Sequence, residues 1–193
     1  MTEEIKAIKK KVKKVLDKDR YQHTLGVAYT AASLAMRYGI DIDRAFLAGI
    51  LHDCAKNIAN DEKFTLCKKY KIKLSDVEKQ APYLIHSKLG ACLAKEIYKV
   101  EDKEILDAVR NHTTGRPGMT VLEKIIFTAD YIEPGRTTAP NLSKIRQMSF
   151  VDLDKAVIEI LKDTLEYLNT KDQIIDPMTQ KTYDYYVACT KQV

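Results

Sequence analysis

Apolar residues recur at helical spacing along nearly the whole chain, and no segment shows the strict alternation of apolar and polar residues that is typical of a strand. Near the N-terminus, one helical stripe carries Ile5, Ile8, Val12 and Val15. The same spacing predicts further helices over Tyr21–Tyr38, Asp43–Lys56, Glu62–Tyr70, Ile85–Tyr98, Lys103–Asn111 and Val121–Ile132. In a long amphipathic helix that follows, the inward positions are Val157, Ile160, Leu161, Leu165 and Leu168.

Local signals indicate where some of these helices begin and end. Gly39 is a typical stop for the helix that ends at Tyr38. Ser75-Asp76-Val77-Glu78 has the form of a capping box, so another short helix is expected after Ser75. Gly and Pro gather in two short segments, 115–118 and 134–135, which are predicted to be loops between helices. Six or more helices with short connections predict an all-α fold, a single compact multi-helix bundle.

The length of the chain, 193 residues, suits one domain with a sizeable core and is short for two. We expect a single domain over residues 1–193, with its core at about 18–135 and a C-terminal helix and tail at about 150–193. No apolar run approaches the roughly 18 residues that a membrane-spanning helix needs. The first residues lack the basic and apolar segments of a secretory signal, so a cytoplasmic location is predicted.

Basic residues exceed acidic ones slightly, giving a formal net charge of +5. Much of the excess lies in one segment, residues 9–14, where lysines surround most of the first helix and no aromatic residue is interleaved for base stacking. A solvated helix face explains this segment better than a nucleic-acid-binding surface does. The four cysteines form no Cys-x-x-Cys pair, so we expect reduced, mostly packed thiols and no zinc site built from them.

The histidines carry the strongest chemical signal in the chain. All four are predicted to lie on the apolar side of a helix or at its end: His23, His52, His86 and His112. One such histidine by itself would be interpreted as a core residue whose ring bonds to a backbone carbonyl. Burying the whole set is costly unless the rings converge on a common partner, because buried imidazoles need partners.

Two aspartates join this set. Asp53 directly follows His52, and Asp130 ends an apolar stretch that begins at Ile125. A buried aspartate is rare unless it is paired or coordinates a metal, although Asp130 could also accept a hydrogen bond at its helix end. Together the six side chains predict a site rich in nitrogen and oxygen ligands. Such ligands suit iron, manganese or zinc better than calcium or magnesium.

Five blocks of the chain point to a known family. They are Arg20–Val27, Gly49–Lys56, His86-Ser87, Asn111–Gly115 and Ala129–Arg136. In this order they contain an H…HD…D signature, and the sequence resembles the HD-domain metal-dependent phosphohydrolases. The closer resemblance is to the YqeK-type branch, the symmetrical bis(5'-nucleosyl)-tetraphosphatases of bacteria. The resemblance implies metal-dependent hydrolysis of diadenosine tetraphosphate to two ADP.

The resemblance also implies roles for the site residues. The implied ligands of a first metal are His23, His52, Asp53 and Asp130. Iron is the ion that the resemblance favours, and manganese or zinc would also suit these ligands. His86 and His112 would line the open side of that metal, where they contact either phosphate or a second metal. The expected catalytic residues are Asp53, Lys56, His86 and His112.

Phosphate chemistry needs positive charge around the transferred group, because charge spreads over its equatorial oxygens. Arg20, Lys56 and Arg136 each lie within one helical turn or a short loop of an expected ligand. Each could instead be a solvated surface cation, but this adjacency favours phosphate binding for Lys56 and Arg136 and, less strongly, for Arg20. Thr113, next to His112, is a weaker candidate for a hydrogen bond to phosphate.

The nucleoside end of the substrate leaves a weaker signal. The resemblance implies that residues 173–177, after the long helix, help to hold the base, and a plain C-terminal loop is an equally good interpretation. Tyr83, Tyr131 and Tyr183 could stack on a purine, although tyrosines at helix edges more often pack against the core. The expected substrate-binding set is Arg20, His23, Lys56, His86, His112, Thr113, Asp130, Arg136, Ile175 and Asp176.

Three other functions stay open from the sequence. One is another nucleotide phosphohydrolase, for example one that removes phosphate from a nucleoside monophosphate. The second is a nucleotide sensor without turnover, which the intact ligands and cations disfavour. The third is a nucleic-acid-binding module that uses the lysine-rich first helix. The expected partners are a dinucleotide substrate and its ADP product, with no membrane partner, and a homodimer is compatible with the sequence.

Overall fold

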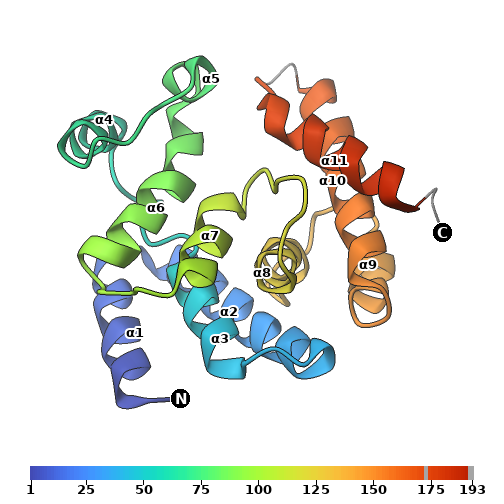
Figure 1. The fold of residues 1–193 in the computed structure, drawn as a ribbon, viewed down its shortest axis with the longest axis horizontal. Coiled ribbons are helices and arrows are strands. Elements are labelled where there is room, and N and C mark those ends of the chain that lie inside the picture. Colours follow the sequence, from blue (N-terminus) through green and yellow to red (C-terminus); the bar gives the residue numbers. More distant parts are fainter. Residues whose placement is uncertain (172–173, 191–193) are drawn as a thin grey trace.

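The computed structural model describes residues 1–171 and 174–190 (Figure 1). Within these ranges the chain forms eleven α-helices and one short 3-10 helix, and it has no strand. The elements are α1 (Glu3–Val15), α2 (Lys18–Tyr38), α3 (Ile42–Leu51), α4 (Asn60–Lys69), α5 (Asp76–Gln80), η1 (Pro82–Leu84), α6 (Ile85–Glu96), α7 (Lys103–Asn111), α8 (Val121–Ile132), α9 (Leu142–Ser149), α10 (Leu153–Thr170) and α11 (Pro177–Thr190). The all-α fold that the hydrophobic pattern predicts is confirmed.

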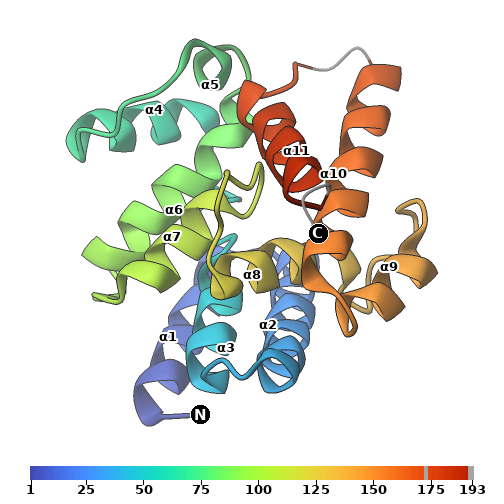
Figure 2. The same cartoon turned by 45° about the vertical axis from the view of Figure 1, so that its right-hand side comes forward.

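Helix α8 is the central element of the fold. It contacts α2, α3, α7, α9 and α10, and it lies between the N-terminal helices and the C-terminal ones in Figure 1. Its inward side chains include Ile125, Ile126 and Ala129, which are fully buried. A capping box between Thr120 and Glu123 fixes where the helix begins. In Figure 2, α10 and α11 lie along one side of α8, and α6 and α7 lie along the other.

The closest helix packing joins α2 to α3. Gly49 in α3 faces Ala28 in α2, and a methyl group on Gly49 would lie 2.6 Å from the Ala28 Cα atom. Only glycine permits this approach, because the atom that would have to yield is backbone. The contact brings the side chains near the start of α2 within reach of those at the end of α3.

Two differences from the predicted helix bounds have clear physical reasons. Helix α3 ends at Leu51, and tight turns follow it, with the Lys56 N–H donating to the Asp53 carbonyl. In these turns each hydrogen bond joins residues three positions apart, which is close to the repeat of an α-helix. The spacing of apolar residues therefore did not distinguish the turns from a continuation of α3. Val15, predicted to lie on the inward stripe of the first helix, is 51% exposed, whereas the next residue, Leu16, is buried. The helix ends at Val15 and the backbone becomes extended at Leu16, so the Leu16 side chain faces the core instead.

Helices α9 and α11 are absent from the sequence prediction. The inward face of α11 carries Thr179, Thr182 and Tyr186, two of which are polar, so it lacks a regular apolar stripe. Helix α9 has only eight residues and buries Leu142, Ile145 and Ser149. The helical periodicity of apolar residues is therefore weak in both segments, and the sequence did not predict either helix.

Other expectations about the whole chain have mixed outcomes. The capping box at Ser75 and the stop at Gly39 are confirmed, and Gly39 adopts a left-handed φ of 68°. Cys54 and Cys67 are buried, free thiols, whereas Cys189 is exposed. None of the described helices is long and apolar enough to cross a membrane. The expected domain bounds and the cytoplasmic location stay predictions.

The close approach of α2 and α3 predicts that Gly49→Ala destabilises the protein by about 1–3 kcal/mol, because the new methyl group must push two backbones apart. Gly90→Ala is the matched control. A methyl group on Gly90 would meet its nearest neighbour at an ordinary 3.5 Å, so this change should leave stability unchanged or raise it through helix propensity. Urea unfolding followed by circular dichroism measures both; equal effects of the two variants would contradict the packing argument.

Candidate metal centre and phosphate site

Six histidine and aspartate side chains from five helices converge on one point. They are His23 in α2, His52 and Asp53 directly after α3, His86 in α6, His112 directly after α7, and Asp130 in α8. These are the six side chains that the sequence singles out. Because five helices contribute, the cluster exists only when the bundle is assembled.

Asp53 occupies the middle of this cluster. One of its oxygens, Oδ2, lies 2.9 Å from Arg20 Nη1 and 3.4 Å from His52 Nε2. The other, Oδ1, lies 3.2 Å from His86 Nε2 and 3.6 Å from His112 Nε2. Burial by itself would raise the pKa of Asp53, but the positive charge that the surrounding imidazoles carry when protonated, that of His52 first, outweighs it. The net effect holds the pKa of this carboxyl well below its usual range, so Asp53 is ionised.

Three of the imidazoles are anchored in the same way. In each, Nδ1 donates to the carbonyl of the residue three positions earlier: His52 to Gly49 at 2.7 Å, His86 to Tyr83 at 2.6 Å, and His112 to Val109 at 2.8 Å. In the neutral ring the proton is on Nδ1, and the Nε2 atom then carries a free lone pair directed at the cluster. This is the tautomer and orientation that a metal-binding histidine needs.

His23 is held differently, between two carboxylates. Its Nε2 atom lies 3.0 Å from Asp130 Oδ1, and its Nδ1 atom lies 3.2 Å from Glu133 Oε1. Burial lowers the pKa of His23, but the two carboxylates outweigh burial and raise it. Glu133 is itself buried and accepts a 2.6 Å hydrogen bond from the Gly135 N–H. Gly26 leaves room for it, because any side chain there would collide with Glu133 Oε2.

Glu133 is a candidate functional residue that the sequence did not single out. It lies within the 129–136 block that carries the family resemblance, but the resemblance implied no role for it. Its position, three residues after Asp130 and therefore about one helical turn further, was the available signal.

The donor set fits a metal ion. His52 Nε2 and Asp53 Oδ1 are buried and have no hydrogen-bond partner among the described residues, a state that is costly unless a cation completes it. Two groups of ligand atoms lie within 4.8 Å of one another: His23, His52 and Asp130, and His52, Asp53 and His112. Their nitrogen and oxygen donors suit a transition metal.

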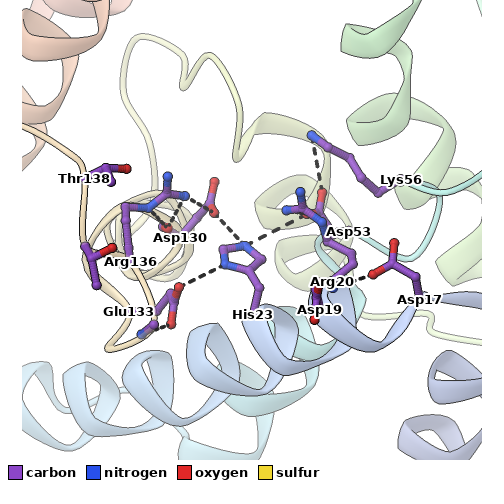
Figure 3. Close-up of a pocket in the computed structure, with 12 residues that line it drawn as sticks. Asp17, Asp19, Arg20, His23, Asp53, Lys56, Asp130, Glu133, Arg136 and Thr138 are labelled. Carbon is purple, nitrogen blue, oxygen red and sulfur yellow. Dashed lines mark hydrogen bonds and ion pairs between the residues drawn. The ribbon is translucent and has the colours of Figure 1, made fainter.

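A charged cavity of about 790 Å³ opens beside the cluster (Figure 3). Three cations line it, Arg20, Lys56 and Arg136, and all three were predicted from their adjacency to ligands. Lys56 Nζ lies 3.2 Å from His86 Nε2, and burial lowers the pKa of His86 to about 4, so that ring is neutral and accepts from the lysine. Besides Glu133 and Gly135, the wall contains four residues that the sequence did not single out: Asp17, Asp19, Thr137 and Thr138.

Arg136 is tied to the cluster through Asp130. Its Nη2 atom donates to the Asp130 carbonyl at 2.9 Å and lies 3.3 Å from Asp130 Oδ1. Burial raises the pKa of Asp130, yet the hydrogen bond from His23 and the nearby imidazole charges lower it further than burial raises it. Asp130 is therefore an ionised ligand candidate that also orients a cation toward the cavity.

The remaining predicted contacts lie elsewhere. Thr113 Oγ1 is 3.4 Å from His86 Nε2 and 3.3 Å from His112 Nε2, so it adjoins the cluster. Asp176 lines a smaller cavity of about 210 Å³ together with Thr113, and its Oδ1 accepts from the Met178 N–H at the start of α11. Ile175 lines neither cavity.

The tyrosines named for the nucleoside, Tyr83, Tyr131 and Tyr183, do not line the charged cavity. Gln173 lies outside the described residues. The Tyr131 hydroxyl bonds instead to the Pro140 carbonyl and to Asp163, which is the packing role that helix-edge tyrosines usually have.

Comparison with known proteins agrees with this geometry. Residues 20–135 match the family model of the HD domain, a span that contains all six members of the cluster. The chain belongs to the HD-domain family. Glu133 also falls within the matched span.

Individual relatives extend over almost the whole chain. The chain is 41% identical to a protein of Bacillus subtilis named symmetrical bis(5'-nucleosyl)-tetraphosphatase, covering 92% of this chain and 94% of that protein. It is 44% identical to a protein of the same name from Halalkalibacterium halodurans, covering 90% and 91%. A crystal structure of a predicted HD superfamily hydrolase from Clostridium acetobutylicum, described as involved in NAD metabolism, matches with a TM-score of 0.91 at 35% identity, over 95% of this chain and 96% of that one.

The geometry predicts that His52→Ala and Asp53→Ala lower metal occupancy at least about tenfold while leaving helical content largely intact. Asp163→Asn is the matched control, because Asp163 is about equally buried but bonds to Tyr131 and Asn141 and to no member of the cluster. Metal analysis of the purified variants, paired with circular dichroism, gives the answer. Full metal content in Asp53→Ala would show that this cluster is not the metal site.

The anchoring of His23 predicts that Glu133→Gln weakens metal affinity about 10–100-fold, because the amide cannot hold the Nδ1 proton as a carboxylate does. Competition with a chelator measures that affinity. Glu78→Gln serves as the control, since Glu78 is also a buried carboxylate but pairs with Lys88 and caps α5. Equal metal affinities in the two variants would leave Glu133 with a purely structural role.

Proposed function

We propose that this chain is a metal-dependent hydrolase that cleaves diadenosine tetraphosphate symmetrically into two ADP. The observation that carries the proposal is the buried cluster around Asp53 opening directly into a cavity lined by three cations. Two relatives that match over at least 90% of both chains carry the name of that activity. The cluster supplies metal ligands, and the cavity supplies the charge that a polyphosphate requires.

The proposed first metal is held by His23, His52, Asp53 and Asp130. Iron is the proposed ion, and manganese or zinc would suit the same nitrogen and oxygen donors. A metal bound there would polarise a phosphoryl oxygen and lower the pKa of a water molecule. His86 and His112, whose Nε2 atoms are 3.1 Å apart, are proposed to contact phosphate or a second ion.

The three cations are proposed to hold the phosphates. Arg20 and Lys56 flank the two oxygens of Asp53, at 2.9 Å from Oδ2 and 3.9 Å from Oδ1, whereas Arg136 adjoins Asp130. If the three cations hold the two phosphates next to one adenosine, the second phosphorus counted from that adenosine lies beside the cluster. Thr113 can donate a hydrogen bond to a phosphate oxygen on the side of His112. The developing charge on the equatorial oxygens is then matched by fixed positive groups.

The reaction that this placement of the phosphates permits is hydrolysis at the central bridging oxygen of the tetraphosphate. The oxygen of water forms a bond to the second phosphorus, and the bond from that phosphorus to the central bridging oxygen breaks. One ADP keeps the attacked phosphorus and gains the water oxygen, and the other leaves with the bridging oxygen. The two protons of the water pass to the departing bridging oxygen, to the surrounding groups or to solvent.

One adenosine is proposed to lie toward residues 174–177. Asp176 lines a cavity that shares Thr113 with the edge of the cluster, which supports this direction. Ile175 is adjacent in the chain and is proposed to contact the base.

The alternatives have less support. The lysine-rich helix α1 buries Ile5, Ile8 and Val12 and lies at the edge of the bundle in Figure 1, and none of its residues lines the charged cavity. A nucleoside monophosphatase would need no extended cationic cavity, and a sensor would need no metal ligands. A homodimer remains compatible with the chain.

This placement of the phosphates, which we call the substrate register, predicts that diadenosine tetraphosphate yields ADP alone. In oxygen-18 water, one of the two ADP molecules should carry the label. Product analysis by mass spectrometry on the metal-loaded protein tests both points. Equal amounts of ATP and AMP would refute the register, because the nucleoside would then sit one phosphate nearer or farther. Release of inorganic phosphate from AMP, with no cleavage of the dinucleotide, would favour the monophosphatase instead.

A further inference from the structure

A second cavity, of about 540 Å³, adjoins the charged one along α2. The two cavities share Asp19, His23, Glu133 and Gly135 as common wall. Beyond that wall the second cavity is lined by Gln22, Leu25, Gly26, Tyr29 and Pro134, and we call it the Tyr29 cavity. It therefore begins at a member of the cluster, His23, and extends away from it. Its volume is in the range of small-molecule sites.

The chemistry of the Tyr29 cavity differs from that of its neighbour. None of the described residues that line it is a lysine or arginine, and two of them, Asp19 and Glu133, are carboxylates. The same two carboxylates line the charged cavity, but there three cations offset them; in the Tyr29 cavity no lining cation does, so a phosphate is disfavoured. One cation lies near it, with Lys9 Nζ 5.9 Å from the Tyr29 ring centroid. Leu25 and Pro134 provide apolar wall, and the Tyr29 ring is 54% exposed. These features suit a neutral, flat group with an apolar face and a few hydroxyls, which describes a nucleoside.

The position of this cavity fits the geometry of a dinucleotide. His86 and His112 adjoin Oδ1 of Asp53, and Thr113, next to both rings, leads from there toward Asp176, whereas His23 lies 4.0 Å from Oδ2. The Tyr29 cavity starts at His23, so it lies on the other side of the carboxylate. A substrate that is cleaved at its centre must have one nucleoside on each side of that centre.

We propose that the Tyr29 cavity binds the second nucleoside of a dinucleoside polyphosphate, the one that departs with the leaving group. This inference rests on the proposed function, because a substrate with one nucleoside would have no use for the cavity. The base stacks on the Tyr29 ring, and the ribose hydroxyls donate to the Asp19 carboxylate. Phe46 packs edge-on against the Tyr29 ring with centroids 5.3 Å apart, which holds the ring in place.

The test compares binding of two hydrolysis-resistant ligands to the metal-loaded protein. One is diadenosine tetraphosphate with a methylene group in place of the central bridging oxygen. The other is adenosine 5'-tetraphosphate with the same methylene bridge and no second nucleoside. Tyr29→Leu keeps apolar cover over Phe46 but removes the aromatic face. It should raise the Kd of the dinucleotide about tenfold and leave that of the mononucleotide unchanged.

Two further variants sharpen the comparison. Tyr29→Phe keeps the ring and should bind both ligands as the wild type does. Tyr167→Leu alters an equally exposed tyrosine, 53% exposed on α10, that lines neither cavity, and should change neither Kd. Equal Kd changes for the two ligands in Tyr29→Leu, or no change for either, would overturn the assignment of the cavity.

Turnover of the natural dinucleotide by the wild type is measured separately and reports on the proposed function. Selective loss of dinucleotide binding in Tyr29→Leu, with no hydrolysis by the wild type, would support the nucleoside site and refute the hydrolase. Hydrolysis to ADP by the wild type, with unselective binding in Tyr29→Leu, would refute the nucleoside site and leave the hydrolase standing. The two failures are thus distinguishable.

Discussion

One buried charge constrains this structure more than any other feature. Asp53 is 2% exposed and ionised, and an isolated carboxylate in such a place would cost several kcal/mol in lost hydration. The chain offsets that cost with Arg20 on one oxygen and imidazoles on both, so the helices that carry these partners must all be in position. The bundle and the cluster therefore depend on each other.

At the ends of α3 and α7, one hydrogen bond satisfies both a helix carbonyl and a buried histidine. The last carbonyls of an α-helix have no partner within the helix, and buried histidines need an acceptor for Nδ1. Gly49 and Val109 lie in the last turns of α3 and α7, and their carbonyls accept from His52 and His112, which follow directly. The bond satisfies the helix end and directs the free Nε2 lone pair inward. His23 lies within the early turns of α2, where the carbonyls are used by the helix itself, so a carboxylate, that of Glu133, takes that place.

The residues matched by the family model and the helices that follow them contribute different parts of the structure. The HD-domain match ends at residue 135, and everything in the cluster lies before that point. Helices α9, α10 and α11 follow it; α10 packs on α8 and α11 packs on α10. This later part brings Asp176 to the cavity beside Thr113. The candidate metal cluster thus lies entirely within the matched core, and the later helices add Asp176 beside its edge.

The sequence by itself determined the helical class, the bounds of α7 and α8, and the six side chains of the cluster, because apolar periodicity and polar residues within it are local signals. It also singled out Arg20, Lys56 and Arg136, since each is near a ligand in the chain. Only the tertiary structure decided that Glu133 holds His23, that Leu16 replaces Val15 in the core, and that α11 packs through threonines. Those outcomes depend on which surfaces meet, and the contacts join residues up to 110 positions apart, beyond what local spacing encodes.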